Sequence, residues 1–396
     1  MEWDICEARN IRKREEDFIN LNPIQRAGVL TAAARKALIS YGDGYSTCDL
    51  CLKPFRLDKI QRPPIGNFYQ ELAEWLNMDV ARVVPGARRG FQAVALSLLK
   101  PKDIVLGSVL NHYTVFLAVE EAGASIAETK VDENYLLTPE SFTQKIEEIR
   151  RVYGKDQPKL AFISHVDYLF GNLHPIEELI KIAKSYSIPF LYNGAYTVGV
   201  MPVDGKKLGA DFIVGSGHKS MASPAPTGVL ATSDEWAAKI FATSTQTGDV
   251  SGRRFGIKET HLLGCTVMGA PLLGMMASFP YVKERIKKWD EEVKKARFFI
   301  EEFEKIKGNR VLGQRPHMHT LMKLDTTNSF DKIAQTHKKK GYFLYQELDA
   351  RGITGIFPGA TRNFKINLYG LTWEQIRYLA ESFQEIAVKY GIPVSG

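Results

Sequence analysis

Short apolar runs alternate with amphipathic stretches along most of this chain. Helices are predicted in the amphipathic stretches, for example at Gly90–Leu99 and Pro175–Ser185. Strands that alternate with helices in this way favour an α/β fold, in which helices cover both faces of a mainly parallel sheet. Buried strands are predicted where β-branched and aromatic residues cluster, at Ile104–Leu106, Leu160–His165, Pro189–Asn193, Asp211–Val214 and Gly228–Ala231.

The chain is expected to divide into three parts. The stretch from Tyr281 to Ile306 has helical periodicity and dense charge, which predicts a long helix leading into a smaller C-terminal α+β domain. That domain ends with a predicted helix over Thr372–Tyr390. The first sixty residues show no clear helical or strand periodicity, and they are interpreted as an arm that packs on a partner subunit. The predicted parts are an N-terminal arm (1–60), a large domain (61–290) and a small C-terminal domain (291–396).

The composition is that of an ordinary globular protein. The chain has 396 residues, of which 44% are hydrophobic and 24% are charged. It contains no run of about twenty apolar residues that predicts a membrane span, and its charged start lacks the apolar core of a signal peptide. The protein is therefore expected in the cytosol. The formal net charge of +7 suits a polyanionic partner, because lysines and arginines that neutralise phosphates release counterions.

Lys219 is the strongest candidate for catalysis. In DFIVGSGHKSMASPAPTGVL, a predicted strand is followed by Ser216, Gly217, His218 and Lys219. Reactive groups in α/β folds lie beyond the carboxyl ends of strands. A lysine held there among apolar residues can lose its proton, as Schiff-base chemistry requires. The alternative is an ordinary solvated lysine, which the flanking Ser-x-His and the trailing glycine disfavour.

Three further segments carry weaker signals. The turn in VVPGARRGFQAVALSLL opens a helix, whose free backbone N–H groups can hold a phosphate beside Arg88 or Arg89. His112 follows the next strand and can stack on a flat ring. Asn193 ends a later strand, where it can contact a ring nitrogen with Ala195 beneath the ring. Taken singly, an ordinary helix start and a structural histidine remain open explanations.

The cysteines indicate sulfur or metal chemistry. In a reducing compartment the Cys48-x-x-Cys51 pair favours metal binding or redox chemistry over a disulfide. Cys265 lies among apolar residues, where a buried structural role is an equal alternative. The three cysteines suit an iron–sulfur cluster with one iron open, or one persulfide with two helpers, and the sequence leaves both open. Cys6 is assigned no role.

The succession of these elements resembles the fold-type-I pyridoxal-phosphate enzymes, which have the aspartate aminotransferase-like fold. The segment ISHVDYLFGNLHPIEELIKIAKSYSIPFLYNGAY looks most like the branch of cysteine desulfurases and class V aminotransferases. Within that branch the chain resembles the O-phosphoseryl-tRNA:cysteinyl-tRNA synthase family over almost its entire length. The segments that carry this resemblance are STCDLC, GNFYQELAEWLNMDVARVVPGARRG, LYNGAY and GSGHKSMASPAPTG.

The resemblance implies a cofactor, a substrate and partners. Members of this family are archaeal homodimers that convert phosphoseryl-tRNA into cysteinyl-tRNA and associate with phosphoseryl-tRNA synthetase. Carried over to this chain, Lys219 binds pyridoxal 5′-phosphate as a Schiff base. Cys48, Cys51 and Cys265 handle sulfur, as a persulfide or as ligands of a cluster. The residues expected around the cofactor are Ala87, Arg88, Arg89, His112, Asn193, Ser216, Gly217, His218 and Lys219.

The implied reaction is a β-elimination followed by addition of sulfur. Lys219 is displaced by the amino group of the substrate and then removes the α-proton, while the cofactor ring absorbs negative charge. Phosphate leaves from the β-carbon, and sulfur from the cysteines takes its place. Because the substrate is an ester, a carboxylate-binding arginine is unnecessary. Arg362, which stands where such an arginine is expected, is assigned to substrate phosphate or tRNA.

One residue departs from the pattern of the branch. Asn193 stands where an aspartate usually keeps the pyridine nitrogen of the cofactor protonated. A neutral amide cannot act as a counter-ion, so the ring is expected to be a weaker electron sink. Such a ring suits the loss of a good β-leaving group better than it suits transamination.

Contacts with tRNA are expected from exposed basic residues. The candidates are Arg253 and Arg254, which follow a loop with a glycine, and the run Lys338–Lys340. Ordinary solvated charge is the alternative for each of them. Contacts of this kind would make binding depend steeply on salt.

Two other functions compete with this interpretation. A cysteine desulfurase or related β-lyase would act on free amino acids, but its nucleophilic cysteine usually lies on a mobile loop late in the chain. After Lys219 this chain offers only Cys265. A non-catalytic tRNA-binding or sulfur-relay scaffold is the second alternative, and the intact Lys219 argues against it. Production of alanine from free cysteine would favour the first, and absence of a yellow chromophore would favour the second.

Overall fold

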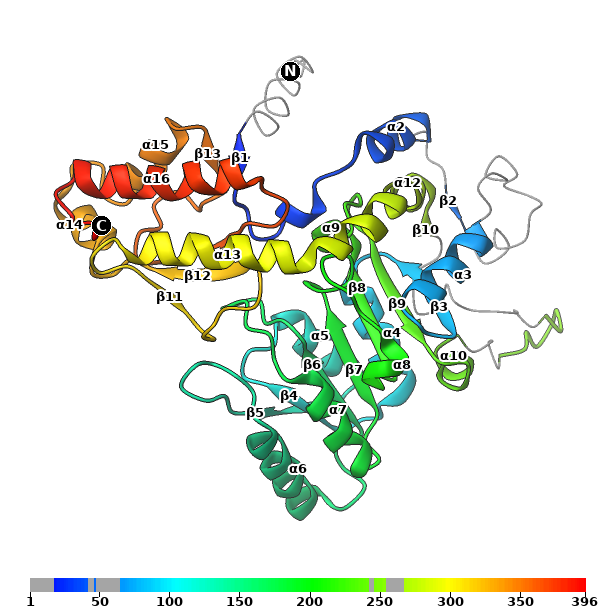
Figure 1. Ribbon diagram of the computed structural model, residues 1–396. Coiled ribbons are helices and arrows are strands. Elements are labelled where there is room, and N and C mark those ends of the chain that lie inside the picture. Colours follow the sequence, from blue (N-terminus) through cyan, green and yellow to red (C-terminus); the bar gives the residue numbers. More distant parts are fainter. Residues whose placement is uncertain (1–17, 42–45, 48–64, 242–245, 254–266) are drawn as a thin grey trace. The chain divides into compact units, whose positions relative to one another are not determined.

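The computed structural model in Figure 1 describes residues 18–41, 46–47, 65–241, 246–253 and 267–396. The chain forms two compact units. The larger unit contains Ala27–Tyr168 and His174–Lys287, and the second contains the chain up to Arg26, Leu169–Leu173 and Lys288–Gly396. The units therefore part between Lys287 and Lys288, close to the predicted end of the large domain at residue 290.

A seven-stranded sheet with the order β3-β9-β8-β7-β6-β4-β5 forms the centre of the larger unit. Strands β4 to β8 run parallel to one another, whereas β9 runs antiparallel to both β3 and β8. All five strands predicted from the sequence are confirmed, as is the mainly parallel sheet. The strands are β3 (Val80–Val84), β4 (Ile104–Ser108), β5 (Ser125–Thr129), β6 (Leu160–Ser164), β7 (Phe190–Gly194), β8 (Phe212–Ser216) and β9 (Gly228–Thr232).

Helices cover both faces of this sheet (Figure 1). One core contains side chains of α3, α6, α7 and α12, and the other contains side chains of α4, α5 and α10. Alternate residues of one strand enter different cores, since Ile104 and Leu106 join the first and Val105 joins the second. The helices are α2 (Ala32–Ser40), α3 (Ile65–Trp75), α4 (Ala87–Leu98), α5 (Tyr113–Glu121), α6 (Pro139–Tyr153), α7 (Ile176–Ser185), α8 (Gly205–Leu208), α9 (Gly217–Ser220), α10 (Asp234–Ile240) and α12 (Gly269–Arg285).

The long helix predicted from Tyr281 to Ile306 is not continuous. Helix α12 ends at Arg285, a 3₁₀ turn covers Ile286–Lys288, and α13 (Trp289–Glu304) follows. The prediction was wrong because a 3₁₀ turn repeats every three residues, close to the helical period of 3.6, so the apolar pattern continues across the break. The break falls where the two units part.

The second unit combines a small sheet with helices. Its antiparallel sheet has the order β11-β12-β14, and β1 (Ile19–Asn20) pairs with β13 (Ile353–Thr354) in parallel. The predicted C-terminal helix is confirmed, with Thr372 as its N-cap. One apolar core, which includes Phe299, Phe330 and Phe383, joins these elements. They are β11 (Arg310–Leu312), β12 (Leu321–Asp325), β14 (Asn363–Asn367), α13, α14 (Phe330–Thr336), α15 (Tyr342–Asp349) and α16 (Trp373–Lys389).

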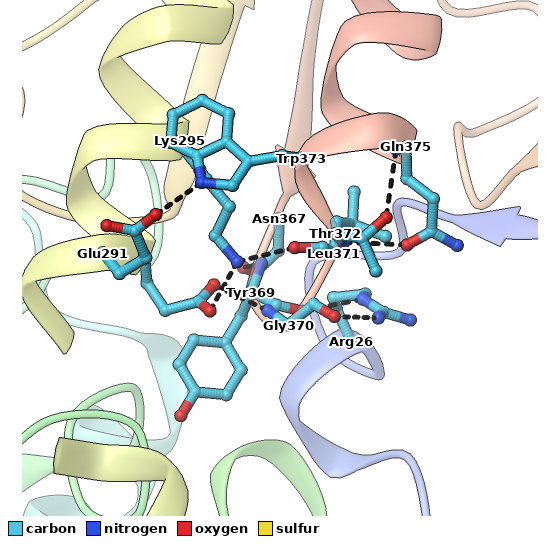
Figure 2. A network of polar contacts seen from close by, with 11 residues as sticks. Arg26, Glu291, Lys295, Asn367, Tyr369, Gly370, Leu371, Thr372, Trp373 and Gln375 are labelled. Atoms are coloured by element: carbon cyan, nitrogen blue, oxygen red, sulfur yellow. Dashed lines mark hydrogen bonds and ion pairs between the residues drawn. The ribbon is translucent and has the colours of Figure 1, made fainter. Parts of the chain in front are cut away.

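A buried ion pair fixes the loop between β14 and α16 (Figure 2). Lys295 Nζ donates to Glu292 Oε1 and to the carbonyl oxygen of Leu371, both at 2.6 Å. The other carboxylate oxygen of Glu292 accepts from the N–H of Gly370 at 2.8 Å. Arg26 donates to the carbonyl oxygens of Tyr369 and Gly370. Side chains from α13 and from the N-terminal segment thus satisfy the backbone of this loop.

The described residues among the first sixty include a helix and two short strands, and they pack on other parts of the chain. In the larger unit, helix α2 packs along α12, and the Thr31 and Ser278 hydroxyls lie 3.2 Å apart. The two-residue strands β2 (Ser46–Thr47) and β10 (Val267–Met268) pair in antiparallel fashion. The packing of this segment on a partner subunit stays a prediction. A search of the described residues finds no helix that is long and apolar enough to cross a membrane.

Candidate active site

The predicted site residues of the larger unit lie at the carboxyl ends of parallel strands. Asn193 ends β7 beside Ser164 of β6, its partner in the strand register. On the other side of β7, Gly194 is the partner of Gly215, and Lys219 follows the end of β8. The chain crosses from β4 to β5 at one edge and then returns to β6, so the order reverses next to β4. Such a reversal is where open α/β sheets bind ligands.

The turn before α4 meets the segment after β8. Gly86 has φ of 88°, and a Cβ there would lie 3.9 Å from the His218 ring. A Cβ on Gly228 would lie 2.7 Å from the backbone nitrogen of Ala87, so this approach requires glycine. Because β9 lies between β3 and β8, it brings the predicted phosphate turn to Ser216 and His218, which are far away in the sequence.

Lys219 lies on the one-turn helix α9 and is partly buried. Its Nζ is 4.9 Å from the centroid of the Tyr196 ring. His218 Nδ1 lies 3.0 Å from the carbonyl oxygen of Thr227, which can only accept, so we assign a hydrogen to Nδ1. Burial lowers the pKa of His218, and the charge of Lys219 lowers it further, against the opposite effect of the Thr227 carbonyl. Neutral His218 therefore has an acceptor nitrogen at Nε2.

Asn193 is buried with its amide orientation fixed. Its Oδ1 accepts from the N–H of Ala195 at 3.1 Å, and its Nδ2 donates to Ser164 Oγ at 2.8 Å. The backbone N–H is always a donor, so the oxygen and nitrogen of the amide cannot be exchanged. The amide nitrogen has a second hydrogen, and Asn193 can offer a ligand that hydrogen as a donor.

Two tyrosines that the sequence analysis did not select belong to this site. The His112 ring meets the edge of the Tyr168 ring with centroids 4.8 Å apart. Burial raises the pKa of Tyr196, and the charge of neighbouring Tyr168 acts in the same direction. Lys219 is thus in contact with the Tyr196 ring, and His112 with the Tyr168 ring. Both tyrosines follow strand ends, β6 and β7, and that placement is the signal that could have found them.

The two arginines after the phosphate turn are placed differently from one another. Arg88 is exposed, and its Nη2 donates to the Tyr113 hydroxyl at 2.8 Å. Arg89 is partly buried in the first turn of α4. His112 is the N-cap of α5, where its Nδ1 accepts from the N–H of Thr114. Arg88 and His112 thus meet through Tyr113, whose ring contacts both.

A phosphorylated, ring-shaped cofactor fits these residues. Ser216 Oγ is buried and has no hydrogen-bond partner among the residues that the structure describes. A buried hydroxyl without a partner is costly, so its position beside the N-terminus of α4 is explained by a ligand oxygen. The lysine amine, the Asn193 donor and the His112 ring add a nucleophile, a contact for a ring nitrogen and a stacking surface.

The predicted sulfur site is not described. Cys6, Cys48, Cys51 and Cys265 all lie outside the described residues, as does Arg254. Within the described ranges, no group of three or more histidine, cysteine, aspartate or glutamate side chains could hold a metal ion. The described neighbours of two cysteines do meet, since Thr47, which precedes Cys48, pairs with Val267, two positions after Cys265.

Comparison with known proteins identifies the class of protein. Residues 66–353 match the family described as Aminotransferase class-V, and the chain belongs to that family. Its fold is that of the fold-type-I pyridoxal-phosphate enzymes. A cysteine desulfurase from Thermococcus onnurineus NA1 shares this fold with a TM-score of 0.73 and 18% identity, over 96% of this chain and 98% of its own.

The particular family is narrower. An O-phospho-L-seryl-tRNA:Cys-tRNA synthase 1 of Methanococcoides burtonii is 62% identical over 384 residues, which are 97% of this chain and 83% of that protein. A synthase of the same name from Methanoregula boonei is 56% identical over 98% of both chains. A solved SepCysS–SepCysE N-terminal domain complex matches with a TM-score of 0.86 and 42% identity, over 98% of this chain and 100% of that one. The chain belongs to the O-phospho-L-seryl-tRNA:Cys-tRNA synthases, a family of enzymes.

Proposed function

We propose that this chain converts O-phosphoseryl-tRNA into cysteinyl-tRNA with pyridoxal 5′-phosphate bound at Lys219. The observation that carries the proposal is the partly buried Lys219 beside the unpartnered Ser216 hydroxyl and the N-terminus of α4. A lysine amine after β8 and a phosphate cradle after β3, the two strands that flank β9, suit this cofactor and few other ligands. When bound, the cofactor supplies an aldehyde for the Schiff base and an electron sink for the α-carbanion.

The cofactor phosphate is assigned to the residues that meet at the α4 turn. Ala87 and Arg88 are the first two residues of α4, where the helix itself supplies no acceptor for the backbone N–H groups and the helix dipole favours an anion. Ser216 adds a buried hydroxyl, and Gly217 and His218 complete the turn. The ring is assigned to His112 on one face and Ala195 on the other.

Asn193 is assigned to the ring nitrogen as a hydrogen-bond donor. The amide oxygen already accepts from the Ala195 N–H, whereas one Nδ2 hydrogen is left after the bond to Ser164, so we assign that hydrogen to the ring nitrogen. A ring nitrogen that accepted this hydrogen bond would carry no proton. This supports a weak electron sink, which suits loss of phosphate better than transamination.

Lys219 is assigned two roles in proton transfer. Once the incoming amino group has released it, the neutral amine of Lys219 would take the α-proton. The same amine later returns the proton and expels the product. Arg88 and Arg89 are candidates to neutralise phosphate as it leaves.

Sulfur delivery is assigned to Cys48, Cys51 and Cys265. The pairing of Thr47 with Val267 supports a common site, because it holds the chain next to Cys48 near the chain next to Cys265. A thiolate can carry sulfur as a persulfide, or three thiolates can hold a cluster with one open iron. The proposal covers either sulfur carrier.

A surface of the second unit is assigned to tRNA. The lysine turn, Lys338–Lys340, is exposed and lies between α14 and α15. A Cβ on Gly341 would lie 2.1 Å from the carbonyl oxygen of Gly359, so the turn packs on the loop that carries Phe357. Phe357 is 78% exposed and Tyr342 is 54% exposed. Lysines beside exposed aromatic rings suit a single-stranded RNA end, whose bases stack while its phosphates are neutralised.

Other basic residues are weaker candidates for the same ligand. Arg362 Nε lies 3.3 Å from Asp331 Oδ2, which offsets part of its charge. Arg253 is exposed. We also propose a homodimer and an association with phosphoseryl-tRNA synthetase. A SepCysE-like protein is a further candidate partner, because the related solved structure is a complex with SepCysE.

The proposal is tested by supplying phosphoseryl-tRNA and a sulfur donor to protein purified without air. Release of phosphate together with formation of cysteinyl-tRNA is expected, and free phosphoserine should not replace the charged tRNA. Formation of alanine from free cysteine, without turnover of phosphoseryl-tRNA, would contradict the proposal and identify a desulfurase.

A further inference from the structure

The amino group of Lys219 lies against the ring of a buried tyrosine. Its Nζ is 4.9 Å from the centroid of the Tyr196 ring, within the range of a cation–π contact. Tyr196 is only 7% exposed, and burial raises the pKa of its hydroxyl. The ring is therefore uncharged at physiological pH and presents an aromatic surface of negative potential to the lysine.

The backbone fixes Tyr196 in this position. It lies on a turn directly after β7, in which the N–H groups of Thr197 and Val198 both donate to the carbonyl oxygen of Gly194 at 3.0 Å. The preceding residue, Ala195, is bound to the Asn193 side chain. The ring is thus placed by hydrogen bonds on both sides of the residue.

Arg285 of α12 ties the lysine segment to the tyrosine segment. Its guanidinium donates to the carbonyl oxygen of Ser220, next to Lys219, at 2.6 Å, and to that of Gly199 at 3.0 Å. Gly199 approaches so closely that a Cβ there would lie 2.3 Å from the carbonyl oxygen of Ser220. The contact between Lys219 and Tyr196 is therefore a built feature of the site.

Lys219 changes charge during turnover if the proposed function holds, and this inference rests on that function. When the amine takes the α-proton, the carbon–hydrogen bond breaks, a nitrogen–hydrogen bond forms, and the electron pair stays on the substrate. The product is an ammonium ion in a partly buried site, where lost hydration makes it costly. Among the described residues, His218 and Tyr196 interact with Lys219 directly. Tyr168 interacts with Tyr196, and Arg285 binds the carbonyl oxygen of Ser220, the residue after Lys219.

An aromatic ring suits this task better than a carboxylate would. A carboxylate beside Lys219 would hold the amine protonated and prevent it from forming a Schiff base. A ring face attracts the ammonium more weakly, so both charge states remain accessible. We propose that Tyr196 is a positioning residue whose ring holds Lys219 while the lysine carries the substrate proton.

The test uses the holoenzyme and alanine methyl ester, an amine that displaces Lys219 but has no leaving group. Its binding is followed by the change in Schiff-base absorption at different pH values. Where the released lysine takes up a proton, the dissociation constant depends on pH, and the midpoint of that dependence reports the stability of the ammonium. Titration of the ester itself is common to all variants.

Three variants test whether the aromatic ring of Tyr196, rather than its hydroxyl or a general effect of losing a tyrosine, sets this midpoint. Tyr196→Leu should lower the midpoint by about one pH unit, as expected for loss of a desolvated cation–π contact. Tyr196→Phe keeps the ring and should leave the midpoint within a few tenths of a unit. Tyr186→Leu is the matched control, because Tyr186 contacts the Arg150 guanidinium at 4.7 Å, next to the amino end of β7. It should leave the midpoint unchanged.

Fluorinated phenylalanines at position 196 keep the protein foldable while weakening the ring face step by step. The midpoint should fall with each added fluorine. An unchanged midpoint across this series and in Tyr196→Leu would overturn the inference, as would equal shifts in Tyr196→Phe and Tyr196→Leu, which would assign the effect to the hydroxyl. If the unsubstituted protein has no Schiff-base absorption, the proposed function itself has failed.

Discussion

The amide of Asn193 donates a hydrogen bond of 2.8 Å to the hydroxyl of Ser164, across the carboxyl ends of β7 and β6. Its oxygen accepts from the Ala195 N–H, and the second hydrogen of its Nδ2 is left to donate to a ligand. A cofactor ring nitrogen at Asn193 is then expected without a proton.

Replacing Asn193 by aspartate should change the reaction more than the fold. A carboxylate can still accept from Ala195 N–H and from the Ser164 hydroxyl, and it adds a counter-ion for a protonated ring nitrogen. We expect Asn193→Asp to slow phosphate release about tenfold, or ~1.4 kcal/mol in the barrier, and to gain transamination. Phosphate release and formation of pyridoxamine phosphate measure the two outcomes. Faster elimination without new transamination would count against the assigned role.

The sequence predicted the strands correctly, for physical reasons that the structure makes clear, and the role of Lys219 stays a prediction. A buried parallel strand requires a short apolar run, so segments such as Phe190–Gly194 stand out. Ser216 to Lys219 follow such a run, and their position after a strand end is enough to select them as candidate site residues. The turn predicted to hold phosphate was selected in the same way, and it lies at the start of α4.

Other features depend on long-range packing, which a local pattern does not contain. Antiparallel β9 brings Gly86 to His218, and nothing in either segment encodes that approach. Tyr168 and Tyr196 look like ordinary core aromatics until the strand ends are placed side by side. The break between α12 and α13 is hidden because the apolar period continues through it.

Binding of tRNA should depend on the lysine turn. In the double variant Lys338→Glu with Lys340→Glu, affinity for phosphoseryl-tRNA should fall at least about tenfold, and the slope of log affinity against log salt should decrease by about two. The matched control is Lys102→Glu with Lys155→Glu, which changes the same charge at exposed positions near the amino ends of β4 and β6. Lys102 and Lys340 both have a positive φ, so a substitution meets a similar backbone conformation in the control and in the test variant.

Equal losses in the two double variants would mean that only net charge matters, and the assigned surface would be wrong. Phe357→Ala adds a readout that charge cannot explain. It should weaken binding by about 1–3 kcal/mol with little change in the salt slope, since stacking does not release counterions.

The buried ion pair of the second unit should carry much of its stability. Lys295→Met leaves the Glu292 carboxylate buried without its cation, and the free energy of unfolding should fall by about 3–5 kcal/mol. Lys294→Met is the control, because the Lys294 side chain is 70% exposed and its Nζ is 3.9 Å from Glu291. It should cost under about 1 kcal/mol. Urea unfolding measures both, and equal effects would contradict the role of the network in Figure 2.

Acid should destabilise the protein through His317. Burial lowers the pKa of His317 to about 4, and Arg315 and Arg297 act in the same direction. The unfolded chain takes up this proton near the ordinary value of about 6.5, so stability falls as the pH drops from there toward 4. The loss should approach about 3 kcal/mol.

His317→Gln isolates this effect. Glutamine can still donate to the Leu321 carbonyl oxygen, which His317 Nε2 meets at 2.8 Å, but it does not titrate. The free energy of urea unfolding, measured between pH 7 and pH 4.5, should therefore depend less steeply on pH in the variant. Identical pH dependence in both proteins would show that His317 is not the group responsible.

The central claim is that Lys219 carries pyridoxal phosphate and removes the α-proton, and the absorption spectrum tests it most directly. Protein purified without air should show a Schiff-base band that changes when phosphoseryl-tRNA is added, with release of phosphate. Lys219→Ala should lack the band and release no phosphate. A broad additional band lost in Cys48→Ala would favour a cluster over a persulfide. A Lys219→Ala protein with the same band and the same phosphate release, or an unsubstituted protein with no band after addition of the cofactor, would contradict the account.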